Sequence, residues 1–277
     1  MVRLDVVGYW TELKLEIVRR YALEYSRIMA KQTSPSLEHL YIDAFAGPGV
    51  HISRATGDYI PGSPTNALNI EPPFCQYHLI DMSSAKVGML RDAVGEREGH
   101  DVFLYEGDCN EILLSEVFPK AAYGMYRRAL CLLDPYNIDL DWQVIQTAGQ
   151  MGSIEIFLNF MVMDINENVI RRNPDLIPPE GAARMNRFWG DESWRRAGYT
   201  KQGVLFDDMP RKTDNQTLAE AFRQRLVEVA GFKYVPPPLP MRNSKRAVIY
   251  YLFFASPNPI ANRIVESIFN KYRDRGA

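Results

Sequence analysis

The sequence predicts an α/β protein with a mostly parallel sheet. Short apolar runs alternate with helix-like stretches through the first 160 residues, which is typical of repeated β-α-β units. The runs are mostly apolar rather than alternating, as expected of strands covered on both faces. Most of them end at an acid or a glycine. The expected strands are 39–45, 74–81, 102–105, 129–133 and 154–160.

Helical periodicity supplies the elements between and after these strands. Leu13, Ile17 and Tyr21 recur at intervals of four, which predicts a long helix over 9–31. Ser83 or Ser84 is a suitable N-cap for a helix that ends at Val94. Further helices are expected at 111–118, 161–172, 218–229 and 259–272. Strands at 231–235 and 247–255, joined by a proline-rich loop, are expected to form a hairpin.

Length and composition favour one globular domain over residues 1–277, with a helical, arginine-rich insertion at 173–215. The fraction of hydrophobic residues is 46% and the net charge is −2, which excludes a disordered or coiled-coil chain. The absence of a long apolar run excludes a membrane span. Cys75, Cys109 and Cys131 share no metal-site spacing, so we expect buried thiols, no metal and a cytoplasmic protein.

The small net charge conceals two oppositely charged halves. Residues 1–170 carry 13 Lys/Arg and 23 Asp/Glu, whereas residues 171–277 carry 19 and 11. A basic half attracts polyanions, so one explanation is contact with nucleic acid. The equally weighted alternative is that the two halves fold together and their charges pair.

Polar residues gather at four strand ends, where ligands bind in open α/β sheets. Asp43 begins the segment Asp43-Ala-Phe-Ala-Gly-Pro-Gly49, and the next strand ends in Asp81. The third strand leads to Gly107-Asp108-Cys109, and the fourth to Asp134-Pro-Tyr136. A single acid at such a place is usually a cap, but four in succession indicate a site.

The residue types at these strand ends suit an adenosine-type cofactor. Asp81 is placed to accept from the two hydroxyls of a ribose. Asp108 can accept from an adenine amino group, while Cys109 offers its backbone N–H. The glycine turn lacks the third glycine of the dinucleotide fingerprint, because Ile52 stands at that position. A reacting group would lie beside Asp134.

These motifs resemble the S-adenosylmethionine site of class I methyltransferases. More narrowly, the chain is similar to the three-Cys-motif partner proteins. The stretches that carry this resemblance are Lys14–Tyr21, Tyr41–Gly49, Gly62–Pro64, Leu132–Tyr136 and Tyr250–Ala255. The resemblance implies a methyltransferase-like sheet with an antiparallel seventh strand. It also implies a partner similar to radical-SAM proteins that carries the three cysteines itself.

The resemblance also implies roles for individual residues. Asp43, Phe45, Gly47 and Gly49 would hold the methionine end of the cofactor. Asp81 would hold its ribose and Asp108, beside Cys109, its adenine. Asp134-Pro135-Tyr136 is similar to the D-P-P-Y motif of amino-methylating nucleic-acid methyltransferases, where the aromatic ring stacks on a flipped base. One proline is missing here, so Tyr136 sits one residue early and packing is an alternative role for it.

We therefore expect an S-adenosylmethionine-dependent methyltransferase that acts on single-stranded or structured nucleic acid. Arg187, Arg195 and Arg196 of the insertion would bind its phosphates, in one basic face with Arg242, Lys245 and Arg246. Trp189 and Trp194 are expected to fill the insertion's own core. The alternative from another class is a vestigial methyltransferase fold that binds nucleic acid or protein without transferring a methyl group. A small-molecule enzyme would instead have an apolar lid.

Overall fold

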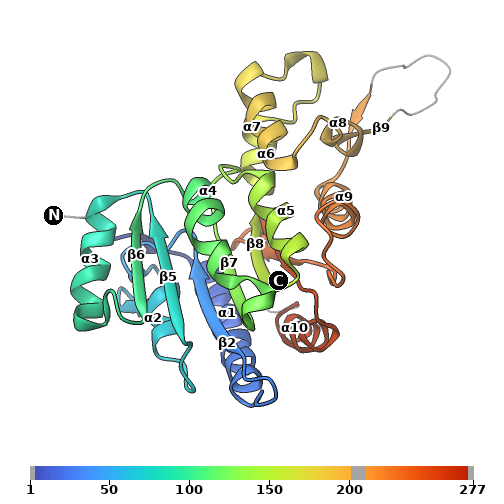
Figure 1. The fold of residues 1–277 in the computed structure, drawn as a ribbon. Coiled ribbons are helices and arrows are strands. Elements are labelled where there is room, and N and C mark those ends of the chain that lie inside the picture. Colours follow the sequence, from blue (N-terminus) through green and yellow to red (C-terminus); the bar gives the residue numbers. More distant parts are fainter. Residues whose placement is uncertain (1–3, 201–209, 274–277) are drawn as a thin grey trace.

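A computed structural model of the chain describes residues 4–200 and 210–273. Its centre is a seven-stranded sheet with the order β11-β12-β8-β7-β2-β5-β6, which helices cover on both sides (Figure 1). The strands are β2 (Glu38–Asp43), β5 (Gln76–Asp81), β6 (Val102–Glu106), β7 (Arg127–Leu133), β8 (Ile154–Phe160), β11 (Leu239–Arg242) and β12 (Val248–Ala255).

Six strands of this sheet share one direction and β12 opposes them. The pairs β2–β5, β2–β7, β5–β6 and β7–β8 are parallel, while β12 is antiparallel to both β8 and β11. Two consecutive connections after β2 lead outward to β5 and β6, and the chain then crosses back to β7. The predicted α/β fold with an antiparallel seventh strand is therefore confirmed.

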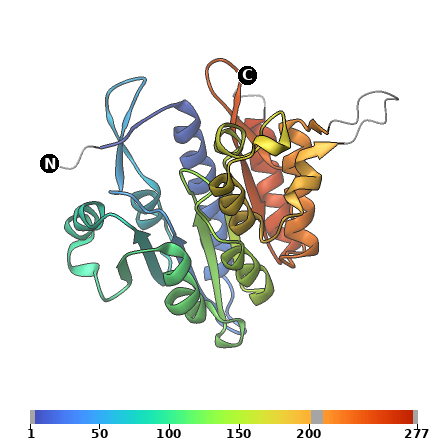
Figure 2. The ribbon, with the colours of Figure 1, turned by 90° about the horizontal axis from the view of Figure 1, so that it is seen from above.

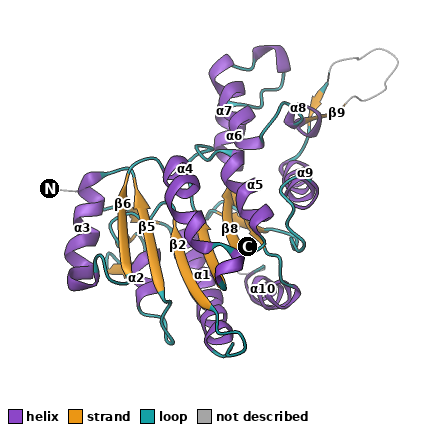
Figure 3. Cartoon of the chain, in the orientation of Figure 1, coloured by secondary structure: helices purple, strands orange, loops and turns teal. Residues whose placement is uncertain are grey.

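Ten α-helices surround or extend this sheet within the described residues (Figure 3). They are α1 (Tyr9–Ala30), α2 (Ser63–Leu68), α3 (Ser84–Val94), α4 (Cys109–Ile112), α5 (Trp142–Met151), α6 (Val162–Asn168), α7 (Pro179–Trp189), α8 (Trp194–Gly198), α9 (Asn215–Glu228) and α10 (Pro259–Tyr272). Shorter strands are β1 (Val6–Val7), β3 (Val50–Ser53), β4 (Tyr59–Pro61), β9 (Tyr199–Thr200) and β10 (Arg211–Lys212). No described helix has the length and hydropathy needed to cross a bilayer.

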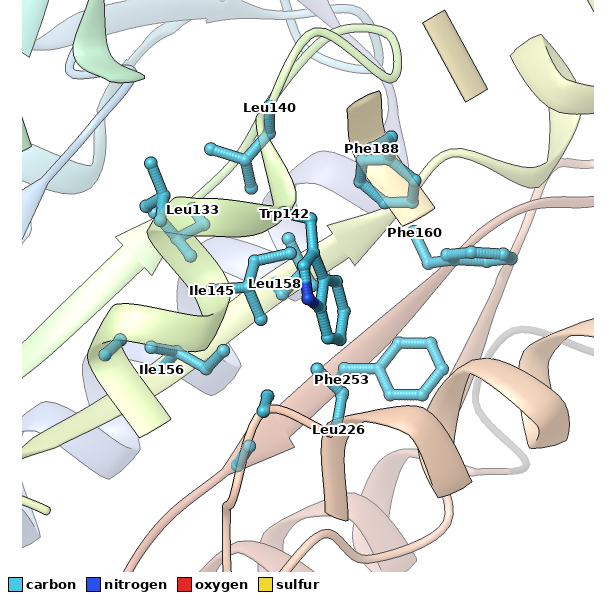
Figure 4. Close-up of a cluster of buried hydrophobic side chains, with 14 of the residues drawn as sticks. Leu133, Leu140, Trp142, Ile145, Ile156, Leu158, Phe160, Phe188, Leu226 and Phe253 are labelled. Atoms are coloured by element: carbon cyan, nitrogen blue, oxygen red, sulfur yellow. The ribbon is translucent and has the colours of Figure 1, made fainter. Parts of the chain in front are cut away.

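The period-two alternation of side chains divides the core into two clusters. In β2, Leu40 and Ile42 face α4, α5 and α9, whereas Tyr41 faces α1, α2, α3 and α10. The central strands are buried on both faces, which explains why their sequences are mostly apolar, with buried exceptions such as Glu155 and Asn159 of β8. Figure 4 shows the first cluster, where Trp142 of α5 packs among residues from β7, β8, β12, α7 and α9.

The predicted C-terminal hairpin is correct in outline, but its first strand was misplaced. The expected strand at 231–235 is irregular, and only Tyr234 forms an isolated bridge, to Ser256. The strand β11 lies instead at Leu239–Arg242, inside the proline-rich stretch. Pro240 is tolerated there because β11 is the outermost strand of the sheet, where one side needs no hydrogen-bond donor.

The expected burial of three cysteines holds for two of them. Cys109 and Cys131 are buried, and burial raises the pKa of the Cys109 thiol to about 12. Cys75 is exposed, so its predicted burial was wrong. It lies at the loop before β5, and its Sγ is 3.9 Å from Nδ1 of His39. All three are free thiols.

The segment predicted as an insertion rises above the carboxyl end of β8 (Figure 1). Its described part holds α7, α8 and the β9–β10 pair. Phe188, Trp189 and Trp194 are buried in the first cluster, beside Phe222 of α9. Both tryptophans are buried as expected, but in the main core that covers the sheet rather than in a core of the insertion's own. Of the expected insertion, residues 201–209 lie outside the described residues.

Candidate functional site

Two adjoining cavities open at the carboxyl ends of the parallel strands. The first cavity has a volume of about 320 Å³ and is lined by residues of the N-terminal segment, the glycine turn and the Asp134 loop. The second cavity has a volume of about 400 Å³ and is lined by the ends of β5 and β6 and the same loop. Phe45, Pro135 and Tyr136 line both, so these three residues form the boundary between the cavities. Both volumes are typical of small-molecule sites.

The second cavity brings together three of the predicted cofactor residues. Asp81, Asp108 and Cys109 all line it, from the ends of β5 and β6. The Asp81 carboxylate accepts from the backbone N–H of Gly47 at 2.9 Å and of Ser83 at 2.8 Å. A carboxylate has about four acceptor positions, so both Asp81 oxygens retain capacity for a diol.

Asp108 begins the short helix α4 and keeps one oxygen available. Its Oδ1 accepts from the backbone N–H and the side-chain amide of Asn110, at 2.9 and 3.0 Å. Both bonds use the same oxygen, which leaves Oδ2 of this exposed residue for a donor on a ligand. Cys109 is buried with a raised pKa, so at neutral pH it is a neutral thiol and contributes its backbone rather than a thiolate.

The glycine turn adopts the left-handed backbone that its sequence indicates. Gly47 has φ of +65° and Gly49 has φ of +79°, a region in which residues with a Cβ are strained. A Cβ on Gly49 would also approach Leu90 at 3.0 Å and Thr65 at 3.1 Å. Gly47 lines the first cavity and is tied to Asp81 in the second, so this turn couples the two cavities.

Asp43 lies beneath the cavities rather than on their surface. Its side chain is fully buried and accepts from the Phe45 backbone N–H at 3.2 Å. Burial raises the pKa of this carboxyl to about 7, against the opposing effect of hydrogen bonds from Ser63 and Phe45. Asp43 lines neither cavity, so it supports the turn from below and reaches a ligand only through Phe45 or Ser63.

Asp134 is held by two side chains that were not among the predicted site residues. The Lys14 ammonium donates to Oδ2, and the Asn159 amide donates to Oδ1. Lys14 comes from α1 and Asn159 from β8, so the trio joins three separate elements. Because an ionised carboxylate only accepts, the amide nitrogen of Asn159 must face Asp134. The Asn159 oxygen is thereby left buried without a recorded partner, in the lining of the first cavity.

Tyr136 presents an exposed ring where the two cavities meet. Its side chain is 65% exposed, and its hydroxyl donates to Asp5 at 2.9 Å. Lys86 of α3 contacts Asp5 at 3.6 Å and lies 5.4 Å from the centre of the Tyr136 ring. Partial burial and the Asp5 carboxylate raise the pKa of the Tyr136 hydroxyl, which therefore stays protonated. One face of the ring is available for a ligand.

His51 also lines the first cavity, from strand β3. Its Nδ1 is buried without a recorded partner. Burial, assisted by the charge of Lys14, lowers its pKa below the ordinary value, so the ring is neutral at pH 7. Asn159 Oδ1 and His51 Nδ1 are therefore two buried polar atoms without a recorded partner, on residues that both line the first cavity. Unpaired buried polar atoms carry an unfavourable free energy that a suitable ligand would remove.

The insertion arginines predicted to bind substrate line neither cavity. Arg187 lies 4.0 Å from Asp141, and Arg195 stacks over the ring of Trp194 at 4.5 Å. Arg196 is exposed on α8. Arg184 pairs with Asp164 at 2.8 Å and with Asp139 at 3.2 Å. Charge pairing between the basic and acidic halves is thus confirmed for Arg184 and Arg187.

The sequence missed Lys14, Asn159 and Asp5 as site residues. Lys14 lies in a stretch that carries the family resemblance, which was the one available signal for it. Asn159 and Glu155 are the two polar residues of the mostly apolar strand β8, and a buried polar side chain needs a hydrogen-bond partner, which was the available signal for Asn159. His51, two residues after Gly49 of the glycine turn, lies in strand β3, and its Nδ1 has no recorded partner.

Comparisons with known proteins leave the family open. No family model and no curated protein matches the sequence. Among solved structures, the chain is similar to a Legionella pneumophila protein at 10% identity and a TM-score of 0.46, over 94% of this chain and 92% of that chain. It is similar to a Listeria monocytogenes protein described as an S-adenosylmethionine-dependent methyltransferase, at 13% identity and a TM-score of 0.37, over 85% and 97%. It is also similar to M. jannaschii TYW2 in complex with AdoMet, at 10% identity and a TM-score of 0.36, over 89% and 75%. Because these scores are low, the fold rests on the strand order itself, and the function rests on the cavities.

Proposed function

We propose that this protein is an S-adenosylmethionine-dependent methyltransferase. The observation that carries the proposal is the pair of cavities that meet at Phe45, Pro135 and Tyr136. A methyltransferase needs one compartment for its cofactor and one for its acceptor, with the transferred group at their junction. The two cavities provide this arrangement at the strand ends where α/β proteins bind ligands.

The second cavity fits the adenosine part of the cofactor. Asp81 retains acceptor positions for the ribose hydroxyls, and Asp108 Oδ2 is available for the adenine amine. The backbone of the Gly47 turn, with open space where a Cβ would lie, leaves room for the methionine end to extend toward the first cavity. When bound there, S-adenosylmethionine supplies an electrophilic methyl group on a sulfonium cation.

The first cavity fits an acceptor that carries an N–H donor. The buried oxygen of Asn159 lacks a donor, and an amino group in the cavity would supply one. Lys14 and Asp134 fix the orientation of the Asn159 amide, with its nitrogen on Asp134 and its oxygen directed away from that carboxylate. The neutral His51 ring offers Nδ1 as the atom that takes the proton lost from the acceptor nitrogen. The exposed Tyr136 ring would stack on a planar acceptor such as a base.

A nucleic-acid base is therefore the acceptor that we propose. It combines a planar ring, which suits Tyr136, with an exocyclic amine, which suits Asn159. The membership of the three-Cys-motif partner family and the partnership with a radical-SAM-like protein remain proposals that rest on the sequence resemblance alone. The two buried atoms without a partner favour a ligand in the first cavity, and the transfer assay below separates catalysis from binding without transfer.

Incubation with radiolabelled S-adenosylmethionine and mixed single-stranded RNA and DNA tests the proposal. We expect labelled N-methyl bases, and their loss in the Asn159→Leu variant, which removes the acceptor oxygen at similar volume. Calorimetric titration of the cofactor into the same variant is the control for folding, because Asn159 does not line the second cavity. Cofactor binding without transfer to any nucleic acid or to free amines would support the binding-protein alternative instead.

A further inference from the structure

A basic groove adjoins the first cavity and takes no part in the site described so far. It has a volume of about 880 Å³ and is lined by Gly8–Trp10, Arg54, Ala55 and the loop between β11 and β12. Seen from above, this loop and the β3–β4 hairpin lie on either side of the start of α1 (Figure 2). Gly8, Trp10 and Arg54 line the groove and the first cavity alike, so the two spaces are continuous.

The groove is strongly positive. Arg54, Arg242, Lys245 and Arg246 line it, and its lining contains no Asp or Glu. Within residues 4–200 and 210–273, none of these four cations forms an ion pair with a carboxylate, in contrast to Arg184 and Arg187 of the insertion. Arg54, Lys245 and Arg246 are exposed and Arg242 is half-buried. Their charges are therefore available for an external anion.

Two aromatic side chains, Tyr9 and Trp10, line the groove together with these cations. Trp10 is half-buried in the groove, with the Arg54 guanidinium 6.0 Å from its ring. The other three tryptophans are 0–6% exposed and belong to the core. Tyr9, which is 53% exposed, extends the aromatic surface. Cations that follow a backbone, together with rings on which bases stack, are the combination that binds single-stranded nucleic acid.

We propose that single-stranded nucleic acid binds in this groove and delivers one base into the first cavity past Trp10. This inference rests on the proposed function for the fate of the base, but the groove's affinity for a strand is independent of methyl transfer. It assigns phosphate contact to Arg54, Arg242, Lys245 and Arg246. The insertion arginines, by contrast, lie outside the groove.

The salt dependence of binding measures these contacts. Each phosphate neutralised on a single strand contributes a slope of about −0.7 to log K against log salt, so four contacts predict about −3. The test uses fluorescence anisotropy of a labelled oligonucleotide at several salt concentrations. The variant Arg54→Gln with Lys245→Gln removes two contacts and is expected to reduce the slope to about −1.4.

Two control variants each remove two positive charges from parts of the protein outside the groove. Arg263→Gln with Lys271→Gln removes two exposed cations from α10, which lines none of the cavities described here. Arg195→Gln with Arg196→Gln tests the insertion directly. We expect both to keep the slope near −3. Equal flattening by all three variants would mean a general charge effect, and flattening by the insertion variant alone would locate binding there. Either result would contradict the proposal that the strand binds in the groove.

Quenching of tryptophan fluorescence gives a second readout. Bases that stack on Trp10 are expected to quench part of the intrinsic emission, and Trp10→Phe, which keeps a ring for packing, is expected to abolish this quenching. The proposal would also be contradicted if no oligonucleotide bound at low salt, or if polyglutamate bound and the oligonucleotide did not. Calorimetric binding of S-adenosylmethionine in the same preparation separates that failure from a failure of the proposed function.

Discussion

Lys14 and Asp134 are 120 residues apart in the chain and form an ion pair at the edge of the first cavity. The side chain of Lys14 is 7% exposed and that of Asp134 is 22% exposed. Lys14 belongs to α1 and Asp134 follows β7, so the pair fixes the first helix against the loop that would meet the acceptor. Through Asn159, the same pair orients the buried oxygen that we assign to the acceptor amine.

The first prediction concerns this pair. Asp134→Ala is expected to abolish methyl transfer and to lower the free energy of unfolding by about 3–5 kcal/mol, because it leaves the buried Lys14 charge unpaired. Affinity for S-adenosylmethionine is expected to change only a few-fold, since Asp134 does not line the second cavity. Chemical denaturation, activity and calorimetry measure the three effects.

The double variant Lys14→Met with Asp134→Asn separates structure from chemistry. It removes both charges but retains an amide oxygen for Asn159. We expect it to recover most of the lost stability while transfer stays absent. Full activity in either variant would move the acceptor site away from Asp134.

The second prediction separates the ring of Tyr136 from its hydroxyl. The hydroxyl bonds to Asp5 on the surface, so Tyr136→Phe is expected to retain activity. Tyr136→Ala removes a stacking surface that contributes about 1–3 kcal/mol, so KM for an oligonucleotide should rise about 5- to 150-fold. Steady-state kinetics with both variants is the measurement. Equal effects of the two substitutions would exclude stacking.

The third prediction concerns His51 and pH. Burial lowers the pKa of His51 below the usual histidine value of 6.5, so the neutral ring that can accept a proton is present at pH 7. The ring becomes protonated only when the pH falls below 6.5. The kcat should therefore be constant from pH 8 to about 6.5 and decline in more acidic buffer. His51→Gln should lower kcat without weakening cofactor binding, and should remove this acidic limb. An unchanged pH profile in that variant would exclude His51 from proton transfer.

The fourth prediction concerns stability alone. Glu155 is buried in β8, where it accepts from the hydroxyls of Tyr21 and Ser256. Burial raises its pKa from 4.5 to about 7. A carboxyl whose folded pKa is raised supports stability fully below the unfolded pKa, and this contribution is lost as the pH rises through the folded pKa. The shift predicts a loss of about 3 kcal/mol between pH 4 and pH 8.

Glu155→Gln isolates this effect, because a glutamine at that position cannot ionise. The stability of the variant relative to the wild type should rise with pH over the same interval, as measured by urea unfolding. Asp43, whose pKa is also raised to about 7, adds a similar dependence to both proteins and cancels in the comparison. A difference that is independent of pH would show that Glu155 has the same pKa in the folded and unfolded states, which contradicts the raised pKa.

The sequence predicted most of the sheet because its strands are unambiguous. Mostly apolar runs marked β2, β5, β6, β7 and β8 within a few residues, and all of them except β8 end at or next to an acid or glycine. The acids at or just after these strand ends include Asp81, Asp108 and Asp134. Because parallel strands end at the same edge of a sheet, the sequence predicted that these three residues lie together. The helix α10 was predicted with its observed bounds, Pro259–Tyr272, because a proline begins it and its apolar residues have helical spacing.

Other features depend on contacts that no local pattern encodes. Asn159 reads as an ordinary strand residue until β7 brings Asp134 beside it. The edge strand β11 contains Pro240, and proline-rich sequence indicates a loop unless the strand's position in the sheet is known. The groove joins residues 8–10, 54 and 242–246, which only the folded chain places together.

Calorimetric titration of S-adenosylmethionine tests the central claim most directly, with Asp81→Ala as the variant and Asp92→Ala, an exposed aspartate on α3, as the control. A hydrogen bond to a charged group contributes about 1.5–3 kcal/mol, so Asp81→Ala should weaken binding about 10- to 150-fold while Asp92→Ala leaves it unchanged. A cofactor analogue without ribose hydroxyls should bind Asp81→Ala and Asp92→Ala with equal affinity, because it has no diol for Asp81 to hold. This comparison separates the diol contact of Asp81 from its hydrogen bonds to the backbone of Gly47 and Ser83. Failure of the wild-type protein to bind the cofactor, or unchanged affinity in a folded Asp81→Ala protein, would contradict the account.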